Sequence, residues 1–208
     1  MSLYSLSMNS SRLAHQTQTR ARILESARSE LEVHGYRDAN TARIAHAAGV
    51  AHGTVFLHFS TREQLLDAIV LSDALADAAE ALPHLRASAS LGELLTLHLR
   101  QLSAHLPFAR LLARELPFLS PSLRAHILVS RTALVEAMRL SILAGQEAGT
   151  FKPGDPAVLL AFWLGAIERH LVHPDLLPPL TERGPALRDT FLDMLTIEQP
   201  GRRSPDDL

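Results

Sequence analysis

Residues 40–59, NTARIAHAAGVAHGTVFLHF, constrain the fold of this chain more than any other segment. Apolar side chains recur at helical spacing on both sides of Gly49, and Asn40 precedes the first run as a helix N-cap. Small side chains at Ala45 and Ala48 allow two helices to cross closely at the turn. We therefore expect a helix, a tight glycine turn and a second short helix, which together form a helix-turn-helix.

Helical patterns continue on both sides of this motif. Residues 17–34 have an apolar stripe at helical spacing, and Gly35 stands where a left-handed residue ends a helix. Thr61 to Gln64 resembles a capping box that opens a long helix, with Thr61 or Ser60 as the cap. A linker is expected over residues 83–90. Further helices are predicted over residues 91–106, 108–116, 121–148, 157–173 and 186–197, with Pro-rich connections between several of them.

The composition supports an all-α fold of about nine helices. Ala and Leu dominate, aromatic residues make up only 5%, and no alternating β-branched run is long enough for a sheet. The chain has no cysteine, which excludes disulfides and Cys-ligated metal sites and is compatible with a cytoplasmic location. We expect neither a signal peptide nor a membrane span, because no apolar run reaches about 18 residues.

Several short motifs occur together, without a gap, between residues 19 and 70. The motifs are Arg22-Ile23-Leu24, Gly35-Tyr36, Ile44-Ala45, Ala48-Gly49-Val50, Gly53-Thr54-Val55-Phe56-Leu57-His58-Phe59 and Arg62-Glu63. This set resembles the amino-terminal signature of TetR/AcrR-family transcriptional regulators and covers about a quarter of the chain.

The resemblance implies a two-part organisation. We expect a flexible arm over residues 1–15 and a three-helix DNA-binding domain over residues 16–63, with the helix-turn-helix at 40–59. A larger helical ligand-binding and dimerisation bundle follows over residues 64–197, and residues 198–208 form a disordered tail. The net charge of −2 requires the positive charge of a DNA-binding protein to be local.

Carried over residue by residue, the resemblance implies that the second motif helix enters the major groove. The DNA contacts expected from it are Thr41, His52, Gly53, Thr54, Phe56, Leu57, His58 and Arg62. The chain departs from the family pattern at Phe56, which lacks a tyrosine hydroxyl, at His52, which replaces a lysine, and at Ala42. We therefore expect few direct base contacts and a large share of shape readout.

The rest of the chain is predicted to contain a dimerisation surface and an effector-binding site. Two DNA-binding modules are needed on a palindromic operator, so we expect a homodimer through the helices around 157–173 and 186–197. A small apolar effector is expected to bind in the bundle and release the DNA. Candidate effector contacts, each of which is also explained as an ordinary core residue, are Leu102, His105, Phe108, Leu112, Phe118, Ile127, Trp163 and His170.

Other functions compete with this dimeric, effector-released repressor. One is an apolar-ligand carrier without operator activity, and another is a repressor controlled by a partner protein. A third is a helical metallohydrolase that uses His170 and His173, although two histidines near a helix end are usually solvated. We expect no cofactor and no catalysis, because no nucleophile lies in a recognisable motif.

Overall fold

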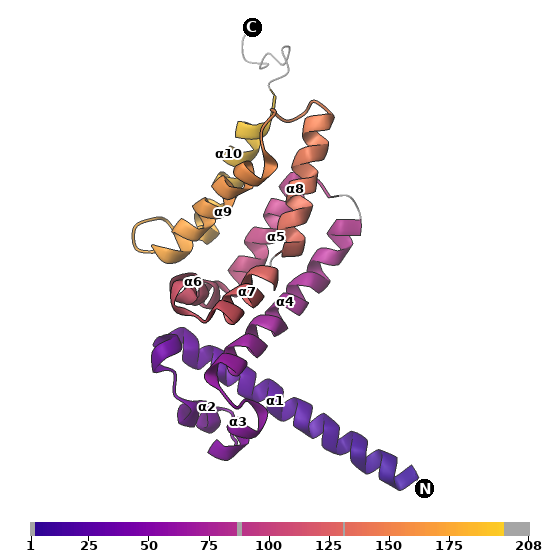
Figure 1. Cartoon of the computed structure of the whole chain (residues 1–208), viewed down its shortest axis with the longest axis vertical. Coiled ribbons are helices and arrows are strands. Elements are labelled where there is room, and N and C mark those ends of the chain that lie inside the picture. Colours follow the sequence, from indigo (N-terminus) through magenta and orange to yellow (C-terminus); the bar gives the residue numbers. More distant parts are fainter. Residues whose placement is uncertain (1–2, 87–88, 131, 198–208) are drawn as a thin grey trace. The chain divides into compact units, whose positions relative to one another are not determined.

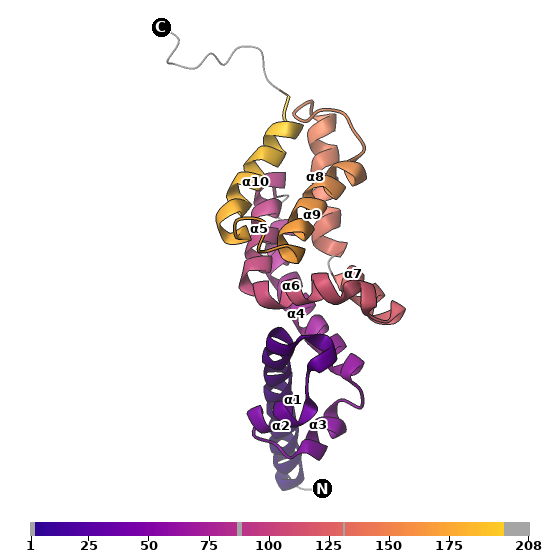
Figure 2. The same ribbon diagram turned by 90° about the vertical axis from the view of Figure 1, so that its left-hand side faces the viewer.

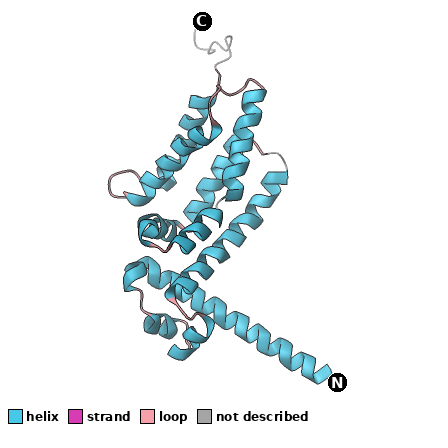
Figure 3. Cartoon of the chain, in the orientation of Figure 1, coloured by secondary structure: helices cyan, strands magenta, loops and turns pink. Residues whose placement is uncertain are grey.

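The computed structural model describes residues 3–86, 89–130 and 132–197, and in these ranges the chain is all-α (Figures 1 and 3). The described residues contain no strand, only a single antiparallel bridge between Phe151 and Thr196. The helices are α1 (Leu3–Asp38), α2 (Thr41–Ala47), α3 (His52–His58), α4 (Arg62–Arg86), α5 (Leu91–Ala104), α6 (Leu106–Glu115), η1 (Leu116–Phe118), α7 (Pro121–Ser130), α8 (Thr132–Glu147), α9 (Pro156–Val172) and α10 (Leu180–Leu195).

The chain divides into two compact units, and α4 contributes residues to both. Unit 1 comprises residues 1–76 and 105–130, and unit 2 comprises residues 77–104 and 131–208. Unit 1 therefore contains α6, η1 and α7, although the sequence predicts these residues in the later bundle. None of the helices described has both the length and the apolar content that a bilayer crossing requires.

Unit 1 is built around one aliphatic core to which every one of its helices contributes. Ile23 and Ala27 of α1 are fully buried, and Ile44 of α2, Val55 of α3 and Leu66 of α4 are almost as inaccessible. The second segment of the unit completes this core with Phe108, Leu112 and Ile127. Burial of a large aliphatic side chain contributes about 1.5–3 kcal/mol, so this shared core holds the helix-turn-helix against α1.

A part-buried ion pair joins α1 to α4 within unit 1. The Arg28 guanidinium donates to both carboxylate oxygens of Asp73, one of them at 2.9 Å. The same guanidinium lies over the Phe108 ring of α6, 4.7 Å from the ring centroid. One side chain of α1 therefore contacts two other helices, and a part-buried cation of this kind is tolerated because it is paired.

Unit 2 is a four-helix arrangement (Figure 2). Helix α5 packs against α8 and α10, and α9 packs against the same two helices. Trp163 is the largest fully buried side chain here, and its ring lies 5.7 Å from that of Phe191. Its indole nitrogen donates to Nδ1 of His98 at 3.0 Å, which satisfies the polar edge of the buried ring.

Most of the predicted helix boundaries agree with the structure. Asn40 caps α2 by accepting from the amide of Ala42 at 2.8 Å, and Asp155 caps α9 in the same way. At the start of α4, the amide of Gln64 donates to Thr61 Oγ1, and the Gln64 side chain reaches back to the amide of Ser60. These contacts confirm the predicted capping box, with Thr61 as the cap.

Four helix boundaries differ from the prediction. Helix α1 begins at Leu3 rather than near residue 17, so the segment expected to be a flexible arm is helical in the structure. Helix α4 continues past Pro83, where a linker was expected. The single helix expected over 121–148 is divided into α7 and α8, and α10 begins at Leu180 instead of residue 186.

Tertiary packing accounts for the early start of α10. Leu180 is buried, and Gly184 is covered by the side chain of Leu99 from α5. This packing outweighs the low helix propensity of Pro185. The tail predicted over residues 198–208 lies outside the described residues.

A substitution at Gly49 tests whether the turn between α2 and α3 requires a glycine. Its φ is +64°, and a Cβ added there would meet only the end of Arg22, at 3.9 Å. We expect Gly49→Ala to lower the free energy of unfolding by about 1–2 kcal/mol, because left-handed backbone is strained for any residue with a Cβ. Urea unfolding followed by circular dichroism measures the change.

Gly53→Ala is the matched control in the same motif. Gly53 lies in α3 with nothing within 4 Å of an added Cβ. We expect this variant to be neutral or more stable by about 0.5–1 kcal/mol. Equal destabilisation by the two substitutions would contradict the proposed role of Gly49 in the turn.

Candidate nucleic-acid interface

The helix-turn-helix is set by a small number of backbone contacts. The amide of Gly49 donates to the carbonyl of His46, and the amide of Val50 donates to the carbonyl of Ala45. Helix α3 then begins at His52 with no side-chain cap, and the amide of Thr54 donates to the carbonyl of Ala51 at 2.8 Å. A short, exposed helix start of this kind is suited to a phosphate or to base edges.

All eight predicted DNA contacts lie on the surface of unit 1. Leu57 is 86% exposed and Phe56 is 47% exposed, so these neighbouring residues add apolar surface beside the polar predicted contacts. On either side of these two exposed residues, Val55 and Phe59 are buried in the core and fix the orientation of α3. The remaining predicted contacts are exposed or half-buried and are Thr41, His52, Gly53, Thr54, His58 and Arg62.

Two of these residues contact each other across the turn. Thr41 Oγ1 at the start of α2 lies 3.0 Å from Nε2 of His52 at the start of α3. The His52 ring also makes an edge-on contact with Phe56, with 5.1 Å between the ring centroids. The structure thus brings Thr41, His52 and Phe56 into one cluster and holds the histidine ring in place.

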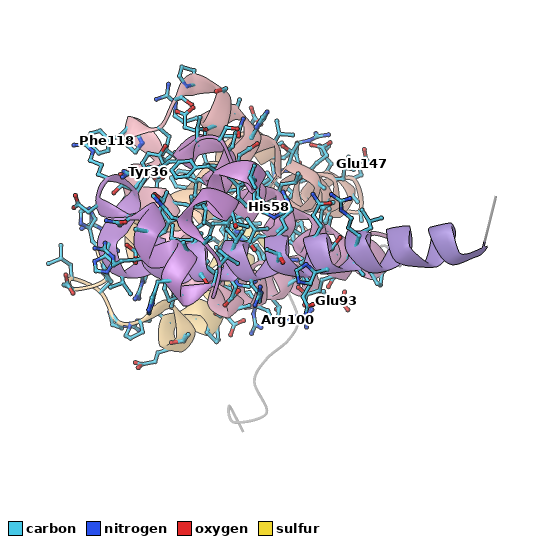
Figure 4. The ribbon with its side chains drawn as sticks, turned by 90° about the horizontal axis from the view of Figure 1, so that it is seen from below. Tyr36, His58, Glu93, Arg100, Phe118 and Glu147 are labelled. Carbon is cyan, nitrogen blue, oxygen red and sulfur yellow. The ribbon has the colours of Figure 1, made fainter. Side chains whose placement is uncertain are left out.

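Arg62, which is predicted to contact DNA, also makes a contact within the protein that the sequence did not reveal. One of its guanidinium nitrogens donates to the carbonyl of Arg37 at 2.7 Å, beyond the break that Gly35 makes in α1 with a φ of +78°. This contact ties the start of α4 to the end of α1. Arg37 itself lies over the ring of Phe118, and Figure 4 shows Phe118 on the same side of the unit as Tyr36.

A carboxylate of α1 supports the start of α2, and sequence reasoning missed it. Glu30 Oε1 accepts from the Asn40 amide at 3.0 Å and from Nε of Arg43 at 2.8 Å. The hydrogen bond from Arg43 is the main reason why the pKa of Glu30 lies below its ordinary value. The only sequence signal was an acidic residue on the same helix face as the buried Ala27 and Ile23, which did not identify its partner.

Because Arg43 is paired, little cationic charge remains on the motif itself. Residues 40–61 contain no Asp or Glu, one arginine and the three histidines His46, His52 and His58. His58 is labelled in Figure 4, which looks onto α1 from below. The absence of carboxylates avoids repulsion of phosphate, and the additional attraction has to come from arginines on neighbouring helices.

The predicted effector contacts are divided between the two units. His105, Phe108, Leu112, Phe118 and Ile127 belong to unit 1. Phe108, Leu112 and Ile127 lie in its core, and Phe118 is 69% exposed.

The other predicted effector contacts, Leu102, Trp163 and His170, are buried in unit 2. An open groove in that unit, between α5 and α10, is lined by none of the eight predicted residues. Its lining residues are Ser90, Gly92, Glu93, Thr96, Leu97, Arg100, Arg188, Asp189 and Leu192.

The two histidines of the metallohydrolase hypothesis lie in different surroundings. His170 is buried, and its Nδ1 lies 2.8 Å from the carbonyl of Ala166, whereas His173 is exposed at the end of α9. In the part of the chain that the structure describes, no group of three His, Asp or Glu side chains could hold a metal ion.

Two family models match the chain, one in each part. Residues 23–69 match the model described as bacterial regulatory proteins of the tetR family, and residues 84–170 match the tetracyclin repressor-like C-terminal domain. An all-α chain with an amino-terminal helix-turn-helix and a helical carboxyl-terminal bundle is the architecture of this class of DNA-binding proteins. The chain belongs to the TetR family of transcriptional regulators.

Curated relatives resemble the chain over its amino-terminal part. The transcriptional repressor AcnR of Corynebacterium glutamicum is 40% identical over 58 residues, which is 28% of this chain and 31% of the relative. The transcriptional regulator UidR of Escherichia coli K12 is 36% identical over 55 residues, 26% of this chain and 28% of the relative. The matches therefore span less than a third of the length of these proteins.

Solved structures resemble the chain over most of its length. The TetR-family regulator PfmR of Thermus thermophilus is 25% identical with a TM-score of 0.69, and the match covers 86% of this chain and 100% of that one. The regulator FadR of Bacillus subtilis, solved in complex with stearoyl-CoA, is 20% identical with a TM-score of 0.70, over 84% and 98% of the two chains. This second likeness concerns the fold alone.

The Glu30 contact generates a prediction about stability and pH. We expect Glu30→Gln to lower the free energy of unfolding, because the substitution weakens both the bond to Arg43 and the support of the Asn40 amide. The pKa of Glu30 is lowered in the folded state. The stabilising contribution is therefore complete above the ordinary value of 4.5 and is lost as the pH falls through the lower folded value.

Urea unfolding of the wild type and of Glu30→Gln between pH 3 and 7 measures this difference. Arg43→Gln and the double variant complete the cycle, and we expect the double variant to be less destabilised than the sum of the single variants. A difference in stability that is independent of pH, or strict additivity, would contradict the assignment.

Proposed function

We propose that this chain is a dimeric transcriptional repressor that binds a palindromic DNA operator and is released from it by a small apolar effector. The observation that carries the DNA-binding part is the surface of α2 and α3. This surface has no carboxylate between residues 40 and 61, and it exposes Leu57 and Phe56. Hydroxyls at Thr41 and Thr54 are available to phosphate, and the apolar side chains are available to sugars or thymine methyl groups.

The decisive experiment is footprinting on the DNA next to the protein's own gene. A repressor of this kind should protect two half-sites with twofold symmetry and lose affinity steeply as salt increases. An apolar-ligand carrier would bind no palindrome, and a repressor controlled by a partner protein would stay bound whichever small molecule is added.

Arg62 tests the assignment of a phosphate contact. We expect Arg62→Ala to weaken binding to operator and scrambled DNA alike and to reduce the slope of log K against log salt by about two per dimer. Fluorescence anisotropy between 50 and 200 mM salt measures the slope. Arg139→Ala on α8 is the control for charge, and thermal unfolding separates a loss of the bond to Arg37 from a loss of DNA contact. A change in base preference would contradict the assignment.

A second copy of the chain is the proposed partner of α9 and α10. Val158 and Phe162, one helical turn apart on α9, are 53% and 63% exposed, and Met194 of α10 is 59% exposed. Gly165 has nothing within 4 Å of an added Cβ, so another helix could approach closely there. An exposed apolar strip on neighbouring helices is typical of a homodimer interface.

Phe162→Glu tests this interface. We expect the charged side chain to dissociate the dimer and to reduce operator affinity at least tenfold, because a single module makes too few contacts. Sedimentation velocity measures the association, and anisotropy measures DNA binding. Val33→Glu is the matched control, since Val33 is an exposed apolar residue of α1. A Phe162→Glu protein that remains dimeric would refute the proposed interface.

The effector is proposed to be apolar and to bind in unit 2. Leu102, Trp163 and His170 are the candidates there, and the indole nitrogen of Trp163 is already bonded to His98. A ligand beside this ring would meet mainly apolar surface. The fold neighbour FadR was solved with stearoyl-CoA, which supports testing long-chain acyl-CoA and fatty acids in the footprinting experiment. For DNA to be released, the effector must bind more tightly to the protein conformation that fits the operator poorly.

A further inference from the structure

In the amino-terminal part of α1, residues 12–18 lie outside the packed core of their own unit. Residues 12–18 are all exposed, on every side of the helix, and packing begins only at Thr19, which is 6% exposed, and Ile23. Figure 1 shows this end of α1 extending beyond α2 and α3. Isolated helical turns are marginal in water, so a helix exposed on all sides is expected to gain stability from a partner outside the unit.

The charge of this segment indicates the chemistry of the partner. From residue 1 to residue 24 the chain has no Asp or Glu, and its charged side chains are Arg12, Arg20 and Arg22. The other side chains of residues 15–19 are His, Gln and Thr, which can all donate hydrogen bonds to an anion. An acid-free, arginine-bearing surface is complementary to a polyanion.

The same charge is continuous with the candidate DNA interface. The Arg20 guanidinium lies over the ring of Phe59, at the end of α3, 5.0 Å from its centroid. Arg22 lies beside the turn of the motif, lining an open hollow with Gly49, Ala48 and Glu25, the first carboxylate of the chain. Arg20 and Arg22 therefore flank the helix-turn-helix, and Arg12 continues the series along the free part of α1.

The helix-turn-helix itself carries little fixed positive charge, and the arginines of α1 would add to it. Arg43 is paired with Glu30, so Arg62 is the arginine between residues 40 and 62 that remains for phosphate, and one of its guanidinium nitrogens also donates to a neutral backbone carbonyl. The other candidate cations of the motif are histidines, which are weaker and depend on protonation. A protein with a net charge of −2 needs fixed positive charge near the phosphates, and the free part of α1 provides it.

We propose that the exposed amino-terminal part of α1 binds the DNA backbone outside each half-site, with Arg12 as its phosphate contact. Thr19 follows Arg12 by seven positions, which is a rise of about 10 Å along the helix. This distance corresponds to roughly three base pairs of duplex, so the contact lies beyond the footprint of α2 and α3. The proposal rests on the DNA-binding function proposed above.

Arg12→Gln tests the proposal, because Arg12 is exposed and its replacement leaves the core of unit 1 intact. Hydroxyl-radical footprinting is done on a long duplex centred on the operator that wild-type protein protects. We expect the variant to lose protection of roughly three outer base pairs on each side and to keep the inner protection. The slope of log K against log salt should fall by about two, one arm contact for each protomer.

Arg114→Gln, an exposed arginine of α6, removes the same charge elsewhere and should leave footprint and slope unchanged. Wild-type protein that binds no operator would overturn the DNA-binding function and the arm contact together. If the wild type binds an operator specifically and Arg12→Gln gives the same footprint and salt slope, the phosphate contact of Arg12 alone would be overturned. Loss of dimerisation by Arg12→Gln in sedimentation velocity would assign the segment to a second protein copy instead.

Discussion

The packing of α1 against the helix-turn-helix is the contact on which the rest of unit 1 depends. Ile23 and Ala27 are fully buried, and they meet Ile44 and Val55 from the two motif helices. A helix of seven residues has too few internal bonds to be stable alone, so α2 and α3 exist because this core holds them. The same packing turns the residues between the buried positions outwards, which is how Leu57 and Phe56 come to be exposed.

Electrostatic contacts then decide which side chains remain available to a ligand. Glu30 engages Arg43 and the start of α2, and Asp73 engages Arg28, so two arginines of unit 1 are committed to holding helices together. Such pairs fix the positions of the helices that they join. Removing one partner is destabilising, because the other charge is left without its counterion. What remains for an anion is a surface without carboxylates, several histidines and the arginines along the first helix.

Local signals predicted the fold well where a single residue determines the backbone. Asn40, Asp155 and the left-handed Gly49 act within a few residues of their own position, and the structure places caps and turn as expected. Long-range contacts could not be predicted in this way. The contact of Glu30 with Arg43 and the early start of α10 both depend on partners that a single sequence does not pair.

For the candidate site, the family motif predicted the surface residues but not how they are supported. Phe108 and Ile127 were assigned to the later bundle from their position in the chain, whereas the structure places them in the core of unit 1. Periodicity shows that such residues are buried, and it does not show against which helix they pack.

This last assignment makes unit 1 discontinuous, since its core needs residues 105–130 as well as residues 1–76. During synthesis on a ribosome, the helix-turn-helix leaves the exit tunnel well before Phe108 and Ile127 exist, and its core stays open until they arrive. A DNA-binding module cut from this chain after α4 would expose part of its own core, and transplanting the module into another protein requires α6 and α7 to be moved with it.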